Sequence, residues 1–222
     1  MFEMNYTILP DKDLSPAQIY VTRQTYDRFA QKFAQNKEWN KNTIKEIEKY
    51  NLKPFIKYAK KNGRVLIVSC QTGRDYVLLT QKGFHCLGVG FSYGLLTEAV
   101  KRVPDGIFVR LDLNRLPFMP DSFEAVYADA LMHNPKKGMR ELLKDFHIFL
   151  KDKGVLYLSV RLGEADVIMM NDLGGKRYIT LYRQDEVLAL VKSAGFKLLW
   201  SAVSPHTDPK LPGWFSLMAK KQ

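Results

Sequence analysis

The chain has 222 residues, of which 46% are hydrophobic and 26% charged, which is the composition of an ordinary globular protein and predicts a single domain. No apolar run approaches the ~20 residues that span a bilayer, and Met1–Met4 lacks the basic and apolar regions of a secretion signal. The two cysteines, Cys70 and Cys86, fall in predicted strands, and the four histidines show no ligand spacing. We therefore expect a cytoplasmic protein without a metal site and without a membrane partner.

Much of the excess behind the formal net charge of +11 lies between residues 23 and 64, where 12 lysines and arginines face four acids. Lys41, Lys45 and Lys49 recur at a spacing that places them on one helix face. Such a basic helix face is usually just exposed to solvent. It could also bind phosphate groups, so RNA stays open as a partner. No zinc finger or RGG tract accompanies it.

The N-terminal part, residues 1–63, is predicted to be a helical cap that is integral to the domain. Ser15-Pro16 is a typical helix start, because serine caps the helix and proline is favoured at its first position. Ile44 and Ile47 belong to a second predicted helix, which we expect to bend near Pro54.

From residue 64 to 222, predicted strands and helices alternate, which favours a parallel sheet covered by helices on both faces. The strands are expected at 64–69, 85–90, 107–111, 123–128, 154–160, 197–203 and 214–220. The helices are expected at 74–82, 93–102, 137–150 and 183–194. The last two strands follow each other directly and are predicted to form an antiparallel pair at one edge. The segment 161–182 is poorly periodic and is expected to be an insertion or lid.

The most informative segment is 64–75, which reads Arg-Val-Leu-Ile-Val-Ser-Cys-Gln-Thr-Gly-Arg-Asp. A buried strand, a tight turn and a helix start are the elements that hold nucleotide-like cofactors. The segment resembles the first motif of class I S-adenosylmethionine-dependent methyltransferases, and segments 111–124, 128–133 and 149–154 resemble later motifs of that family in the right order. The resemblance implies a Rossmann-like, seven-stranded, mostly parallel α/β sheet with an antiparallel C-terminal edge strand.

The resemblance also implies S-adenosylmethionine as cofactor and a set of residues around it. Tyr26 would close over the cofactor, Thr72, Gly73 and Arg74 would lie around its methionine carboxylate, and Asp112 would contact the adenine amino group. Further positions expected in the cofactor site are Ser69, Gln71, Gly90, Phe91, Ser92, Leu113 and Asp129.

Two carboxylates that the family uses are missing. Ile67 stands where an acid usually faces the cofactor's amino group, and Gly90 stands where an acid usually accepts both ribose hydroxyls. Without compensation the loss would cost about 3–6 kcal/mol of cofactor binding. Ser69, Gln71 and Ser92 are available as uncharged replacements. The alternative is a catalytically inactive, methyltransferase-like binding or scaffolding protein with a protein partner.

No complete catalytic constellation is visible in the sequence. His133, just beyond the fourth strand, is the candidate general base. Arg161, Arg177, Tyr178 and Tyr182 are expected around the acceptor pocket, and the two arginines suit an anionic acceptor. The preferred hypothesis is methyl transfer to a small, anionic molecule, with an RNA methyltransferase as a third possibility. A nicotinamide dehydrogenase is disfavoured because the G-x-G-x-x-G turn is absent.

Overall fold

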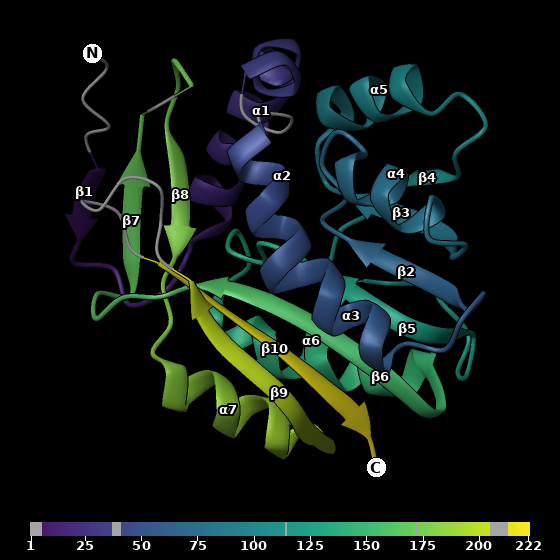
Figure 1. Cartoon of the computed structure of the whole chain (residues 1–222). Coiled ribbons are helices and arrows are strands. Elements are labelled where there is room, and N and C mark those ends of the chain that lie inside the picture. The colour runs from purple at the N-terminus through teal and green to yellow at the C-terminus, as the bar shows by residue number, and fades with distance from the viewer. Residues whose placement is uncertain (1–5, 37–40, 114, 172, 205–212) are drawn as a thin grey trace.

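A computed structural model describes residues 6–36, 41–113, 115–171, 173–204 and 213–222 (Figure 1). The side chains of residues 36, 41 and 42 are not described, so Lys41 of the lysine stripe lies outside the described side chains, whereas Lys45 and Lys49 are exposed. Within these ranges, none of the helices is long and apolar enough to cross a membrane.

A seven-stranded sheet forms the centre of the molecule, as predicted. Its strands are β2 (Arg64–Val68), β3 (His85–Gly90), β4 (Phe108–Arg110), β5 (Phe123–Ala128), β6 (Leu150–Arg161), β9 (Phe196–Ser204) and β10 (Trp214–Lys221). The order is β4-β3-β2-β5-β6-β10-β9, and the pairings among the first five strands are parallel. The C-terminal strand β10 runs antiparallel to both neighbours, and β9 is outermost. The carboxyl ends of β2, β3 and β5 therefore share one edge of the sheet.

Helices cover both faces of the sheet because each parallel connection must cross from one strand end to the next strand start. On one face, α3 (Lys53–Tyr58), α4 (Arg74–Thr80) and α5 (Tyr93–Arg102) enclose a core that contains Ile67 and Tyr127. On the other face, α6 (Lys136–Phe149) and α7 (Gln184–Ser193) pack on Leu66, Val126 and Leu156.

The N-terminal helices differ in part from the expectation. Helix α1 (Pro16–Asn36) begins as predicted, with the Gln18 amide donating to the Ser15 hydroxyl. The second predicted helix is divided into α2 (Lys41–Ile47), a π-helical turn η1 (Glu48–Leu52) and α3. The interruption precedes Pro54, which sits in the first turn of α3, because proline has no amide hydrogen to continue the preceding ladder.

A second, three-stranded antiparallel sheet stands beside α1, at the upper left of Figure 1. It consists of β1 (Tyr6–Leu9), β7 (Val167–Met170) and β8 (Arg177–Thr180) in the order β1-β7-β8. β7 and β8 lie within the segment expected to be an insertion, and β1 was not predicted at all. Short strands that pair with a segment about 160 residues away carry too little local pattern to be recognised.

Candidate active site

The turn between β2 and α4 keeps a glycine-like backbone despite its substitutions. Ser69, Gln71 and Gly73 have φ values of 62°, 50° and 82°, all in the left-handed region. Side chains other than glycine adopt this region at a cost of roughly 1–2 kcal/mol each. Ser69 and Gln71 thus adopt a backbone conformation that glycine adopts without this cost, and such strain is typical of functional turns.

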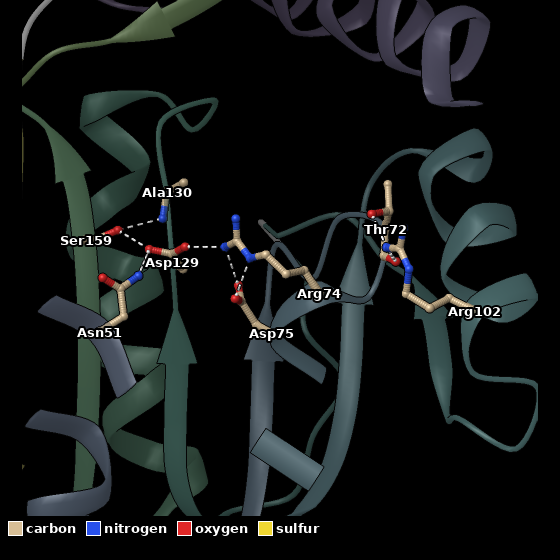
Figure 2. A network of polar contacts seen from close by, with 8 residues as sticks. All are labelled: Asn51, Thr72, Arg74, Asp75, Arg102, Asp129, Ala130 and Ser159. Carbon is tan, nitrogen blue, oxygen red and sulfur yellow. Dashed lines mark hydrogen bonds and ion pairs between the residues drawn. The ribbon is translucent and has the colours of Figure 1, made fainter. Parts of the chain in front are cut away.

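A buried ion-pair network lies directly after this turn, at the ends of β2 and β5 (Figure 2). The Arg74 guanidinium donates to both carboxylate oxygens of Asp75, at 2.9 and 3.0 Å, and to Asp129 Oδ2 at 2.9 Å. The three side chains are only 10%, 6% and 13% exposed, respectively. Arg74 therefore bridges two carboxylates of its own chain.

The second oxygen of Asp129 ties three further elements together. Its Oδ1 accepts from Ser159 of β6 at 2.6 Å and from the Asn51 amide of η1 at 3.0 Å, as Figure 2 shows. Burial raises the pKa of Asp129, the negative charge of Asp75 raises it further, and Arg74 opposes both effects. The network therefore fixes the end of β5 to the helical cap.

Thr72, in the same turn, is held from the opposite side. The Arg102 guanidinium, at the end of α5, donates to the Thr72 carbonyl and, at 2.7 Å, to its hydroxyl. Thr72 is fully buried. The turn is thus fixed by a cation on each flank, Arg74 on one and Arg102 on the other (Figure 2).

At the end of β3, helix α1 supplies a carboxylate that the strand itself lacks. Asp27 Oδ1 accepts from the Ser92 hydroxyl at 2.6 Å and from the Gly94 amide at 2.9 Å. A Cβ on Gly94 would come within 2.6 Å of the Asp27 carbonyl oxygen, so the two helices touch backbone to backbone. Ser92 also caps α5 by accepting from the Leu95 amide.

A hydrogen-bond chain joins α1 to the small sheet. Arg177 donates to the Tyr26 hydroxyl at 2.7 Å, and that hydroxyl lies 2.9 Å from His133 Nε2. His133 Nδ1 lies 2.8 Å from the Tyr178 carbonyl oxygen, which can only accept. Nδ1 must therefore carry a proton. The Tyr26 ring also packs edge-on against Phe91.

A cavity of about 790 Å³ opens between α1, the end of β4 and the start of α6. Its apolar lining includes Leu14, Ile19, Phe91, Leu111 and Pro135. Its charged lining residues are Arg23, Arg110, Lys137 and Asp112. Basic side chains thus outnumber the single carboxylate around a largely apolar interior.

The predicted site residues fall into three groups in the structure. Around the β2–α4 turn lie Ser69, Gln71, Thr72, Gly73, Arg74 and Asp129; along the β3 and β4 ends lie Gly90, Phe91, Ser92, Asp112 and Leu113; Tyr26 and His133 join α1 to the small sheet. Among the residues expected near the acceptor, Arg161 stacks on Trp214 at 4.2 Å, and Tyr182 is fully buried. Ile67 faces the core cluster rather than the turn.

Sequence reasoning missed Asp27, Asn51, Asp75 and Arg102, although each contacts a predicted site residue. Only Asp75 carried a local signal, as an acid in the first turn of a helix. In the described part of the chain, no group of three or more histidine, cysteine or acidic side chains could hold a metal ion.

Comparison with known proteins identifies the class. The family described as "Methyltransferase domain" matches residues 65–154. A protein of Encephalitozoon cuniculi (strain GB-M1) to which methyltransferase activity has been ascribed is 30% identical over 157 residues, covering 62% of this chain and 67% of that protein. The demethylmenaquinone methyltransferase of Renibacterium salmoninarum is 34% identical over 84 residues, which are 36% of this chain and only 35% of that enzyme.

Solved structures share the same fold at low identity. The 1,6-didemethyltoxoflavin-N1-methyltransferase of Burkholderia thailandensis, solved with its substrate and S-adenosylhomocysteine, superposes with a TM-score of 0.74 at 14% identity, covering 99% of this chain and 96% of that one. Protein PH0226 of Pyrococcus horikoshii gives 0.69 at 17% identity, covering 86% and 99%. The chain belongs to the class I S-adenosylmethionine-dependent methyltransferases.

The residues present fit the cofactor of this class. The left-handed Gly73 lies so close to α5 that a Cβ would come within 3.2 Å of Ala99, which keeps the turn compact beneath a ligand. Beyond the β3 end, the cavity offers an aromatic ring, Phe91, and one carboxylate, Asp112. These are groups that can stack on a purine and accept from its amino group.

Proposed function

We propose that this protein transfers the methyl group of S-adenosylmethionine to a small anionic molecule that binds in the cavity beneath α1. The observation that carries the proposal is the charge of the cavity lining. Three basic side chains, Arg23, Arg110 and Lys137, line the cavity together with a single carboxylate, Asp112. A cluster of cations around a largely apolar space favours a ligand that carries a negative charge.

The other features of the cavity support the same class of acceptor. Its volume lies in the ~300–1,000 Å³ range of small-molecule pockets. Arg110 and Lys137 add positive charge at its rim, and the guanidinium of Arg23 lies over the Tyr20 ring at 5.2 Å. An aromatic or aliphatic body with a carboxylate or phosphate would satisfy both the apolar walls and the cations.

In this proposal the chain's own residues divide into two tasks. Phe91 and Asp112, on the β3 and β4 side of the cavity, receive the adenine end of the cofactor, so the acceptor occupies the α1 and α6 side, next to Arg23 and Lys137. The β2–α4 turn with Arg74 and Asp129 shapes the space for the methionine end. The cofactor supplies the activated methyl group, and alignment suffices for an acceptor that is already nucleophilic.

His133 is assigned a positioning role before any role as a base. Both of its ring nitrogens are hydrogen-bonded, to Tyr26 and to the Tyr178 carbonyl, so the ring holds the Tyr26 hydroxyl in place. For His133 to take a proton from an acceptor, Nε2 would first have to exchange the Tyr26 hydroxyl for that acceptor.

The first experiment is a calorimetric titration of the purified protein with S-adenosylmethionine and S-adenosylhomocysteine. Micromolar binding supports the proposal and allows a screen of small carboxylates and phosphates for methylation. Absence of binding at millimolar ligand would contradict it and would favour the inactive scaffolding protein. For an accepted substrate, Arg23→Met should raise KM about tenfold or more with kcat little changed, since it removes ~1.5–3 kcal/mol of charged hydrogen bonding.

The matched control is Lys61→Met, which removes an exposed lysine remote from the cavity lining. It should leave KM unchanged. A neutral analogue of the acceptor should bind wild type and Arg23→Met equally. If Arg23→Met affects neutral and anionic acceptors alike, the anionic class is wrong.

A further inference from the structure

We propose that Asp27, on helix α1, supplies the carboxylate for the cofactor ribose that strand β3 lacks. The inference rests on the proposed function in one respect, that the cofactor binds at all. The sequence resemblance implies this carboxylate at the last residue of the strand, which here is Gly90. The role would therefore have moved from the sheet to the helix that packs over it.

Asp27 lies beside the end of strand β3. Its carboxylate is bound to Ser92 and to the Gly94 amide, two and four residues beyond Gly90. The ring of the neighbouring residue, Tyr26, lies 6.1 Å from the ring of Phe91, measured between centroids. Phe91 is the residue between Gly90 and Ser92. Asp27 thus lies at the very turn where a ribose acid is required.

The two carboxylate oxygens of Asp27 differ in their hydrogen bonds. Oδ1 accepts both hydrogen bonds, from Ser92 and Gly94. Oδ2 accepts none from any residue whose position the structure describes. The Asp27 side chain is only partly buried. One oxygen thus fixes the carboxylate, and the other is available for a ligand hydroxyl.

The backbone at Gly90 leaves space for a side chain. A Cβ there would meet only the tip of the flexible Leu96 side chain, at 3.3 Å, and the Cys70 sulfur at 3.8 Å. Its backbone φ is not in the left-handed region, so a side chain is not excluded by conformation. The strand end could therefore carry an acid, and the charge is found on α1 instead. Placing a second carboxylate there would bring two like charges together.

The test compares S-adenosylhomocysteine with its 2′,3′-dideoxy analogue by calorimetry, in wild type and Asp27→Asn. Asparagine keeps an oxygen for Ser92 and Gly94, so α1 stays docked, which the melting temperature of the unliganded variant checks. We expect Asp27→Asn to weaken S-adenosylhomocysteine binding roughly 10- to 150-fold, the loss of one hydrogen bond to a charged group. The dideoxy analogue should lose less than about threefold.

A second variant decides the question independently of any effect on folding. Gly90→Asp should recover affinity in the Asp27→Asn background and should give no gain in wild type, where the hydroxyls are already bound. Equal losses for both ligands, or an equal effect of Gly90→Asp in both backgrounds, would overturn the role of Asp27 and leave the cofactor assignment intact. Failure of wild type to bind S-adenosylhomocysteine would overturn both.

Discussion

Substitution of the buried cation Arg74 is expected to cause a large loss of folding stability, because it removes the cation that two buried carboxylates share. Arg74→Met preserves most of the side-chain volume but removes the bonds of 2.9 and 3.0 Å to Asp75 and of 2.9 Å to Asp129. Breaking a buried pair from one side costs about 3–5 kcal/mol. For a chain of this size we expect the melting temperature to fall by roughly 6–20 °C.

The loss of stability in Arg74→Met should also depend on pH. Burial and the charge of Asp75 already raise the pKa of Asp129, and the loss of Arg74 would raise it further. A raised carboxyl pKa in the folded state means that stability is lost as pH rises through that pKa. The difference in free energy of unfolding between wild type and Arg74→Met should therefore be larger at pH 8 than at pH 5.

Urea denaturation followed by circular dichroism at both pH values measures the effect. The matched control is Lys101→Met, which breaks an exposed pair with Glu98 and should cost under about 1 kcal/mol. The double variant Arg74→Met/Asp129→Asn should lose less than the sum of the single losses, since one stranded charge is removed. A loss below about 1 kcal/mol that does not change with pH would refute the reasoning.

Three further predictions concern other contacts. Gly94→Ala should destabilise the fold by about 1–3 kcal/mol in urea denaturation, because its Cβ would meet the Asp27 carbonyl oxygen at 2.6 Å; an unchanged midpoint would show that α1 can move away without cost. Tyr26→Phe should lower the free energy of unfolding by about 1–3 kcal/mol, because Arg177 loses its phenolic acceptor, and a neutral effect would mean that Arg177 finds another. Burial raises the pKa of Cys86 to about 12, so its thiol should stay unreactive to iodoacetamide at pH 8 until urea unfolds the chain, and alkylation of the native protein would contradict this.

The parts of the fold that could be predicted are those with local signals. The apolar run Val65–Val68, its turn and Asp75 mark a strand, a loop and a helix start within twelve residues, and the structure has all three there. The alternation of strands and helices similarly predicted the parallel sheet. The π-helical turn at 48–52 was not predictable. It differs from an α-helix only in that each hydrogen bond spans five residues instead of four, which leaves no clear sequence pattern.

The site was predictable only where one segment supplies it. The β2–α4 turn is continuous in sequence, so its residues could be named. Asp27 and Arg102 reach the site from helices 65 and 30 residues away from their partners Ser92 and Thr72, and no local pattern encodes such pairings. The same holds for Arg74: the resemblance predicts that it lies near the cofactor, but only the fold reveals that Asp129 approaches it from the end of another strand.

The small sheet has a consequence for the timing of synthesis. β1 pairs with β7, about 160 residues later, so at ~5–20 residues per second the ribosome needs roughly 8–30 seconds to supply the partner. During that interval β1 has no strand to pair with, while β2, β3 and β5 can already assemble. The small sheet, whose strand β8 carries Arg177 and Tyr178, can therefore form only after β2, β3 and β5 have been made. Strand β1 of this methyltransferase therefore waits for β7, and the central sheet is completed later still, when β9 and β10 have been made.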